Sequence, residues 1–190
     1  LEQLLDEDDS LEITRFLRAV DVRIDGFRVE KAPEWRGQRV FVKHEVDGKG
    51  YELRLSEESA GTQKLMGLAS FLLAALERGG TVVVDELDAM LHPKLLRYVI
   101  LLFKDPEVNK SGAQLIFSSQ DVSTMRNDVF RRDEIWFAAR GEGETSQLWS
   151  LADIHEANGN LVSKNAAFDK QYLSGRYGAD PYLTRIEEWD

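Results

Sequence analysis

Two adjacent carboxylates, Asp85 and Glu86, directly follow the short β-branched run Thr81–Val84. Such a run is typical of a strand that is buried on both faces of a parallel sheet. Ligands of open α/β sheets bind beyond the carboxyl ends of the strands. Because successive side chains of an extended backbone point apart, the two carboxylates are expected to do different work. One can hold Mg²⁺, often through water, while the other orients or deprotonates an attacking water. The alternative interpretation is a solvated turn without function.

A second polar group, Ser59, Gly61 and Thr62, opens a predicted helix upstream of the two carboxylates. Hydroxyls and free backbone N–H groups at a helix N-terminus favour an anion such as a terminal phosphate. Ordinary N-capping by Ser59 or Thr62 is the alternative. Together with the acidic pair, the group indicates a site for a phosphorylated ligand.

The elements that must position these residues can be predicted from apolar periodicity and turn signals. Helices are predicted at 4–20, from 61 or 62 to about 77, and at 93–103. Strands are predicted at 22–29, 39–46, 51–55, 81–84, 114–118, 134–138 and 147–151. Asp47-Gly48 favours a β-hairpin, Gly79-Gly80 a left-handed helix end, and 141–143 a turn between the last two strands. The alternation of strands and helices predicts a layered α/β fold with a mostly parallel core sheet and helices on its faces.

The composition favours one domain over residues 1–190, with 43% hydrophobic residues, no cysteine and a net charge of −10. Its expected parts are a helix and hairpin at 1–55, a core at 56–151 and a docking segment at 152–190. No apolar run is long enough for a membrane helix, so we expect a soluble, cytoplasmic chain. The acidic charge makes nucleic acid an unlikely partner. The first residue is Leu1, and we expect that an N-terminal portion precedes it.

The sequence resembles the ATP-binding-cassette class of ATPases, in the branch of bacterial AAA-type proteins associated with abortive infection and phage defence. Residues 59–63 (SAGTQ) are similar to its signature loop, residues 81–86 (TVVVDE) to its Walker B strand and residues 87–93 (LDAMLHP) to its D-loop. Residues 130–137 and 172–179 resemble later landmarks of the same branch. The resemblance implies the C-terminal lobe of a P-loop-NTPase-like fold.

In that family, the signature loop of one subunit contacts the γ-phosphate of ATP that the other subunit holds. The resemblance therefore implies ATP and Mg²⁺ as ligands and a head-to-tail dimer. It assigns Asp85 to Mg²⁺ and Glu86 to the role of general base. The phosphate contacts in trans would be Ser59, Gly61 and Thr62. Asp88 and His92 would lie in the D-loop at the dimer interface, although a histidine at position 92 could simply be a surface or capping residue.

The sequence departs from the family pattern in two places. Gln120 stands where the family usually has a switch histidine, and glutamine can hydrogen-bond a γ-phosphate but cannot titrate. We therefore expect slow hydrolysis, or hydrolysis that depends on other residues; the alternative is a polar strand end without a role. The chain also has no G-x-x-x-x-G-K-[ST] loop. We expect weak ATP binding alone and pairing with a Walker A-bearing N-terminal portion or subunit, with an effector partner possible.

Three further interpretations remain open. The first is a non-catalytic dimerisation or regulatory module derived from such an ATPase. The second is a metal-dependent nuclease that would use Asp85, Glu86 and Asp88. The third concerns the aromatic and basic residues of 164–182, which either pack against their own domain or stack on nucleic-acid bases; the acidic charge favours packing. His44 and His155 are given no role.

Overall fold

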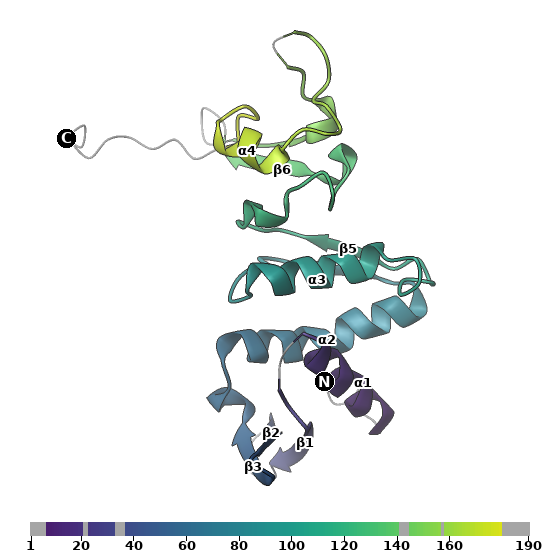
Figure 1. Cartoon of the computed structure of the whole chain (residues 1–190), viewed down its shortest axis with the longest axis vertical. Helices are drawn as coiled ribbons and strands as arrows, with labels where there is room; N and C mark the ends of the chain where they lie inside the picture. The colour runs from purple at the N-terminus through teal and green to yellow at the C-terminus, as the bar shows by residue number, and fades with distance from the viewer. Residues whose placement is uncertain (1–6, 21–22, 33–36, 141–144, 157, 180–190) are drawn as a thin grey trace, which may run out of the picture. The chain divides into compact units, whose positions relative to one another are not determined.

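The structure is a computed structural model that describes residues 7–20, 23–32, 37–140, 145–156 and 158–179. The chain divides into two compact units, Leu1–Gln120 and Asp121–Asp190 (Figure 1). A single domain over the whole chain remains a prediction, and each unit is described by itself. No helix among these residues is long and apolar enough to cross a membrane.

Two helices contribute a large part of the core of the first unit. Helix α1 (Glu7–Ala19) lies beside α2 (Ala60–Arg78), and the predicted helix over 4–20 is confirmed for its described residues. Their apolar faces are removed from water, which is the main favourable term in folding. The fully or almost fully buried side chains of the two helices include Ile13, Phe16, Leu17, Leu65, Met66, Ala69 and Leu72.

A three-stranded antiparallel sheet follows α1, in the order β1 (Gly26–Ala32), β2 (Gly37–Val46) and β3 (Lys49–Arg54). Asp47 and Gly48 both have positive φ, 52° and 72°, as a two-residue type I′ turn requires, so the predicted hairpin is confirmed. The first predicted strand, 22–29, lies further along the chain than expected. A short 3-10 helix, η1 (Leu55–Glu57), connects β3 to α2.

Strands β4 (Thr81–Val84) and β5 (Gln114–Phe117) pair in parallel through a connection that contains α3 (Pro93–Lys104). Helix α2 ends before β4 at Gly79, whose φ of 79° and N–H···O bond to Ala75 (2.8 Å) confirm the predicted left-handed helix end. The α/β fold with a parallel sheet, helices and an antiparallel hairpin is therefore confirmed.

The prediction that Thr81–Val84 is buried on both faces is wrong. Val82 packs against the buried cluster of Ala75, Leu76 and Ala113, and Val84 is buried. Val83 is 73% exposed and Ile116, its register partner on β5, is 55% exposed. Side chains alternate between the faces of a strand, and no described element covers the face that carries these two residues.

The second unit contains the antiparallel pair β6 (Trp136–Arg140) and β7 (Ser146–Ser150) and the short helix α4 (Phe168–Leu173). Three 3-10 helices, η2 (Val122–Thr124), η3 (Arg132–Glu134) and η5 (Leu151–Asp153), complete it. Strand β6 begins later than predicted because Glu134 belongs to η3. The predicted turn at 141–143 lies outside the described residues.

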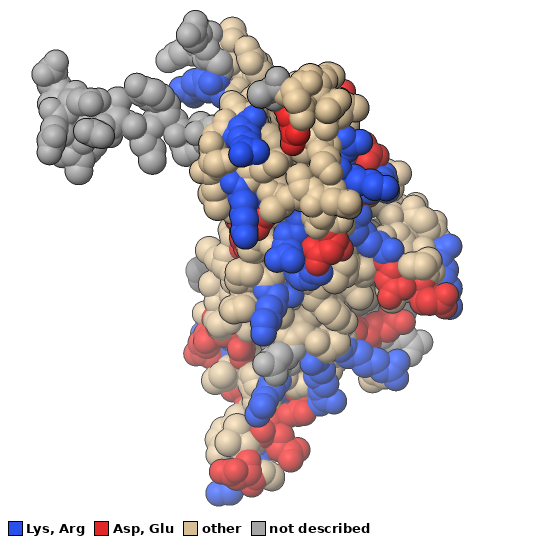
Figure 2. Space-filling view, turned by 45° about the horizontal axis from the view of Figure 1, so that its top comes forward, with Lys and Arg blue, Asp and Glu red and all other residues tan. Residues whose placement is uncertain are grey.

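The C-terminal aromatic residues pack against their own unit, as predicted. Phe168 and Tyr177 are buried in one cluster with Phe137, and the Tyr172 ring stacks on Phe137 with centroids 5.7 Å apart. Residues 180–182 of the predicted segment lie outside the described part. Figure 2 shows acidic and basic side chains next to one another on the face in view.

Candidate functional site

Asp85 is held by a serine that the sequence analysis did not single out. The pairing of Val84 with Phe117 places Asp85 and Ser118 at the carboxyl ends of two adjacent parallel strands. The Ser118 hydroxyl donates a hydrogen bond to Oδ1 of Asp85 and accepts one from the Glu86 N–H at 2.7 Å. One hydroxyl therefore fixes both the carboxylate and the start of the turn. The one signal in the sequence was the position of Ser118 at the end of the predicted strand 114–118, which corresponds to the position of Asp85 after the strand 81–84.

Glu86 lies in a tight turn and not on an extended strand. The strand ends at Val84, and Glu86 has a φ of 50°, in the left-handed region that non-glycine residues seldom adopt. The expectation of an extended backbone at Asp85-Glu86 is therefore wrong. The two carboxylates still have different surroundings. Asp85 is hydrogen-bonded to Ser118, whereas the exposed Glu86 carboxylate has no hydrogen-bond partner among the described residues.

The N-terminus of α2 packs against the turn that follows β4. The Lys64 ammonium donates to the Glu86 carbonyl oxygen. A Cβ atom added to Gly61 would lie 2.9 Å from the Met90 carbonyl oxygen, so the two backbones approach closely there. The structure thus brings the predicted phosphate-contact group and the acidic pair into one part of the first unit.

Ser59 is the N-cap of α2, as the alternative interpretation predicted. Its Oγ accepts from the Thr62 N–H at 3.1 Å and lies 2.9 Å from the Thr62 hydroxyl oxygen. The N–H groups of Ala60 and Gly61, in the first turn of α2, have no acceptor among the described residues. Capping and anion binding are therefore compatible, because two free backbone donors remain in the first turn.

The remaining predicted residues lie in and after the same turn. The Gln120 N–H donates to Oδ2 of Asp88 at 3.2 Å, which ties the segment after β5 to the turn after β4. His92 is the N-cap of α3, and its Nδ1 accepts from the Lys94 N–H at 3.1 Å. The capping role that was the alternative for His92 is thus present in the structure. Both His92 and Gln120 are exposed.

The residues at the strand ends fit Mg²⁺ in the way that nucleotide sites usually bind it. Mg²⁺ commonly keeps several waters and takes one or two carboxylates plus phosphate oxygens. Asp85, with Ser118 beside it, offers such a donor set. Within the described part of the chain, no three His, Cys, Asp or Glu residues are grouped to hold a metal ion, so a cage built from protein ligands alone is absent there. A two-metal nuclease site at Asp85, Glu86 and Asp88 is not supported.

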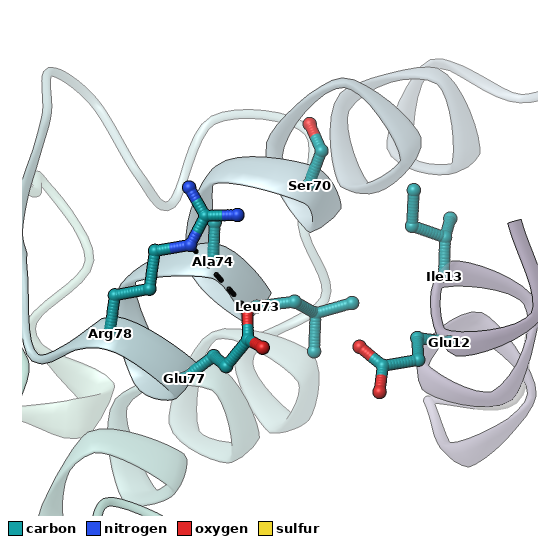
Figure 3. Close-up of a pocket in the computed structure, with 7 residues that line it drawn as sticks. All are labelled: Glu12, Ile13, Ser70, Leu73, Ala74, Glu77 and Arg78. Atoms are coloured by element: carbon teal, nitrogen blue, oxygen red, sulfur yellow. Dashed lines mark ion pairs between the residues drawn. The ribbon is translucent and has the colours of Figure 1, made fainter. Parts of the chain in front are cut away.

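A small hollow between α1 and α2 contains none of the predicted site residues (Figure 3). Its lining side chains include the Arg78–Glu77 ion pair (3.6 Å) and the buried Ser70 hydroxyl, which has no hydrogen-bond partner among the residues that the structure describes. The complete lining is Glu12, Ile13, Ser70, Leu73, Ala74, Glu77 and Arg78. We interpret the hollow as imperfect packing of two helices.

Ligands of open α/β sheets bind beyond the carboxyl ends of the strands, which is where Asp85 and Ser118 lie. Residues 2–126, about two thirds of the chain, match the family described as "AAA domain, putative AbiEii toxin, Type IV TA system". The protein belongs to this family and is a nucleotide-binding, ATPase-like module. No curated protein matches it. One matching solved structure is described as "Structural biochemistry of ATP-driven dimerization and DNA stimulated activation of SMC ATPases". It has 17% identity and a TM-score of 0.45, and the match covers 73% of this chain and 88% of that one.

Proposed function

We propose that this chain supplies one face of an ATP-hydrolysing site. Asp85 would hold Mg²⁺, Glu86 would act as general base, and the N-terminus of α2 would contact the γ-phosphate of ATP bound by a second subunit. A Walker A-bearing portion or subunit would complete the site in a head-to-tail dimer. Phage defence, carried out by an effector partner in the cytoplasm, is the biological role that we propose.

The observation that carries this proposal is the hydrogen-bonded pair of Asp85 and Ser118 at the ends of two parallel strands. The Ser118 hydroxyl orients one carboxylate oxygen and leaves the other for a cation or its water shell. Glu86 lies in the left-handed turn that follows, and its side chain is exposed. One carboxylate is fixed and its neighbour has no partner in the described part of the chain, which suits the different roles of metal binding and water activation.

Each protein group would act on a different part of the reaction. Bound Mg²⁺ would neutralise charge on the phosphate oxygens. Glu86 would accept a proton from the attacking water. The free N–H groups of Ala60 and Gly61, with the Thr62 hydroxyl, would stabilise negative charge on the transferred phosphoryl group. Gln120 could donate a hydrogen bond to the same group without changing its own charge. Asp88 and His92 would lie where the two subunits meet.

The partner portion would cover the exposed face of the parallel sheet. Parallel sheets are ordinarily covered on both faces, whereas Val83 and Ile116 are exposed here. A groove lined by α2 and β4 includes Phe71, itself 50% exposed, and Val83. Burying this apolar surface would stabilise an assembly with the loop-bearing portion.

Calorimetry with Mg²⁺-ATP tests the proposal, first on this chain alone and then on its mixture with the Walker A-bearing portion. We expect binding only in the mixture. Binding by this chain alone would contradict the dependence on an external phosphate loop. No binding in either sample would favour the non-catalytic dimerisation module.

The substitution Glu86→Gln separates the enzyme from that module. In the mixture it should lower ATP turnover by about 10²–10⁴-fold, the usual contribution of a general base, and leave the ATP-bound dimer intact. Glu77→Gln is the matched control because Glu77 is an exposed glutamate of α2 whose side chain is 73% exposed. Equal turnover in both variants would refute the role of Glu86.

A further inference from the structure

His44 connects the antiparallel sheet to the segment that precedes α2. It lies on β2, and its Nε2 is 2.6 Å from Oε1 of Glu58, while its Nδ1 is 2.8 Å from the Arg23 carbonyl oxygen. The two side chains are only 21% and 10% exposed, so water screens their interaction weakly. His44, which was assigned no role from the sequence, therefore holds a largely buried glutamate.

Glu58 is also fixed through its backbone. It lies between η1 and the N-cap Ser59, and its carbonyl oxygen accepts from Nε2 of Gln63 at 2.8 Å. The Glu58 N–H donates to the Leu55 carbonyl oxygen at 3.2 Å. A displacement of the Glu58 side chain would therefore be transmitted to Ser59 and to the first turn of α2.

We propose that His44 is a positioning residue for the phosphate-contact segment 59–63, which it holds in place through Glu58. This inference rests on the proposed function of that segment. It extends the site from the start of α2 to the middle of β2. It also makes the geometry of the site depend on the protonation of one histidine.

The dependence follows from the partners of the ring. Both partners, a carbonyl oxygen and a carboxylate, are acceptors, so both ring nitrogens must donate, which requires the doubly protonated imidazole. When Nε2 loses its proton, the lone pair of this nitrogen faces the carboxylate of Glu58. The other groups near the ring are Asp25, which is paired with Arg18 of α1, and Tyr51, the register partner of His44 on β3.

The same contacts determine the direction of the pKa shift. Burial alone would lower the pKa of His44, but the hydrogen bonds to Glu58 and to the Arg23 carbonyl, with the charges of Glu58 and Asp25, raise it above its ordinary value of 6.5. A histidine whose pKa is raised by folding contributes its full stabilisation below its unfolded pKa. That contribution is lost as the pH rises through the folded pKa.

Amide hydrogen exchange on the full chain tests the inference, read as protection factors between pH 5.5 and 9. In the wild-type chain, protection of the Thr62 and Gln63 amides should fall about tenfold over this range, which corresponds to about 1.4 kcal/mol. His44→Gln, which cannot titrate, should give low protection that is the same at every pH. His155→Gln is the control, because His155 is exposed in the second unit, and it should reproduce the wild-type profile.

A purely structural role of His44 predicts a different result. His44→Gln would then lower protection at the Leu96 amide of α3 as much as at Thr62, and the wild-type profile would be flat; this outcome overturns the inference. Glu58→Gln provides a second variant and should flatten the profile in the same way. Mg²⁺-ATP binding by the wild-type mixture is measured separately. If it is absent, the proposed function fails, whereas the exchange profile alone decides whether His44 holds the segment.

Discussion

Adding one methyl group at two glycines of α2 tests whether the start of this helix packs on the turn after β4. In Gly61→Ala, the new Cβ would lie 2.9 Å from the Met90 carbonyl oxygen, closer than Cβ atoms normally approach. In Gly67→Ala, no atom other than those of the neighbouring residues and the helix's own backbone lies within 4 Å of the new Cβ. Both residues belong to the same helix, so the two variants differ mainly in this contact.

The expected effects have opposite signs. Alanine at position 67 should stabilise the chain by about 0.5–1 kcal/mol, because it limits the unfolded backbone and suits a helix interior. Alanine at position 61 must displace backbone, since Met90 contributes a carbonyl oxygen and not a flexible side chain. Overpacking of this kind typically costs about 1–3 kcal/mol. The two variants should therefore differ by about 2 kcal/mol or more in the free energy of unfolding.

Urea denaturation followed by far-UV circular dichroism measures this difference, and amide exchange at Leu91 locates it. The Leu91 N–H donates to the Asp88 carbonyl oxygen at 2.9 Å within the turn, so its exchange should accelerate in Gly61→Ala only. If Gly61→Ala stabilises the chain as much as Gly67→Ala does, the helix does not pack on the turn. The shared location of the phosphate-contact group and the acidic pair would then be refuted.

Three further predictions concern single side chains. Ser118→Ala should destabilise the chain by about 1–2 kcal/mol in urea denaturation, since it removes two hydrogen bonds, one of them to a carboxylate. The control Ser56→Ala, at an exposed hydroxyl in η1, should change the free energy of unfolding by less than about 0.5 kcal/mol. Equal effects of the two variants would contradict the role of Ser118. His92→Ala should lower the stability by about 0.5–1 kcal/mol in thermal denaturation, whereas His92→Asp should not, because Asp is also a good N-cap. Equal losses in the two variants would argue against capping by His92. Burial raises the pKa of Tyr177 from 10.0 to about 12. The buried neutral phenol should therefore contribute its full stabilisation to the second unit below pH 10, and this stabilisation should be lost as the pH rises towards 12. Absorbance titration of the phenolates checks this, and an ordinary titration of all tyrosines near pH 10 would refute it.

The sequence predicted local features well where one residue type determines the backbone. Asp47-Gly48 and Gly79 specify left-handed conformations, and Pro93 starts α3 at its first position. The strand Thr81–Val84 was predicted with its exact bounds, since β-branched residues favour this conformation strongly. Such signals are local and therefore readable without knowledge of the remaining chain.

Long-range pairing was not predictable in the same way. Ser118 reaches Asp85 only because β4 and β5 pair in one register, and His44 reaches Glu58 only through the path of β2 and η1. The exposure of Val83 could not be predicted either, because the apolar sequence of the strand is the same whether one face of the sheet or both are covered. The sequence therefore indicated the candidate carboxylates better than the groups that hold them.

The exposed face of the β4–β5 sheet limits the amount of this protein that can accumulate in a cell without aggregating. Within the described part of the chain, no further strand pairs with either strand, and Val83 and Ile116 place apolar surface beside their free edges. Exposed edges of this kind recruit other strands and lead to aggregation. We expect that copies synthesised in excess of the partner portion proposed above would associate through these edges or be removed by proteases. Balanced synthesis of the two components would then be as important to the organism as the chemistry of the site.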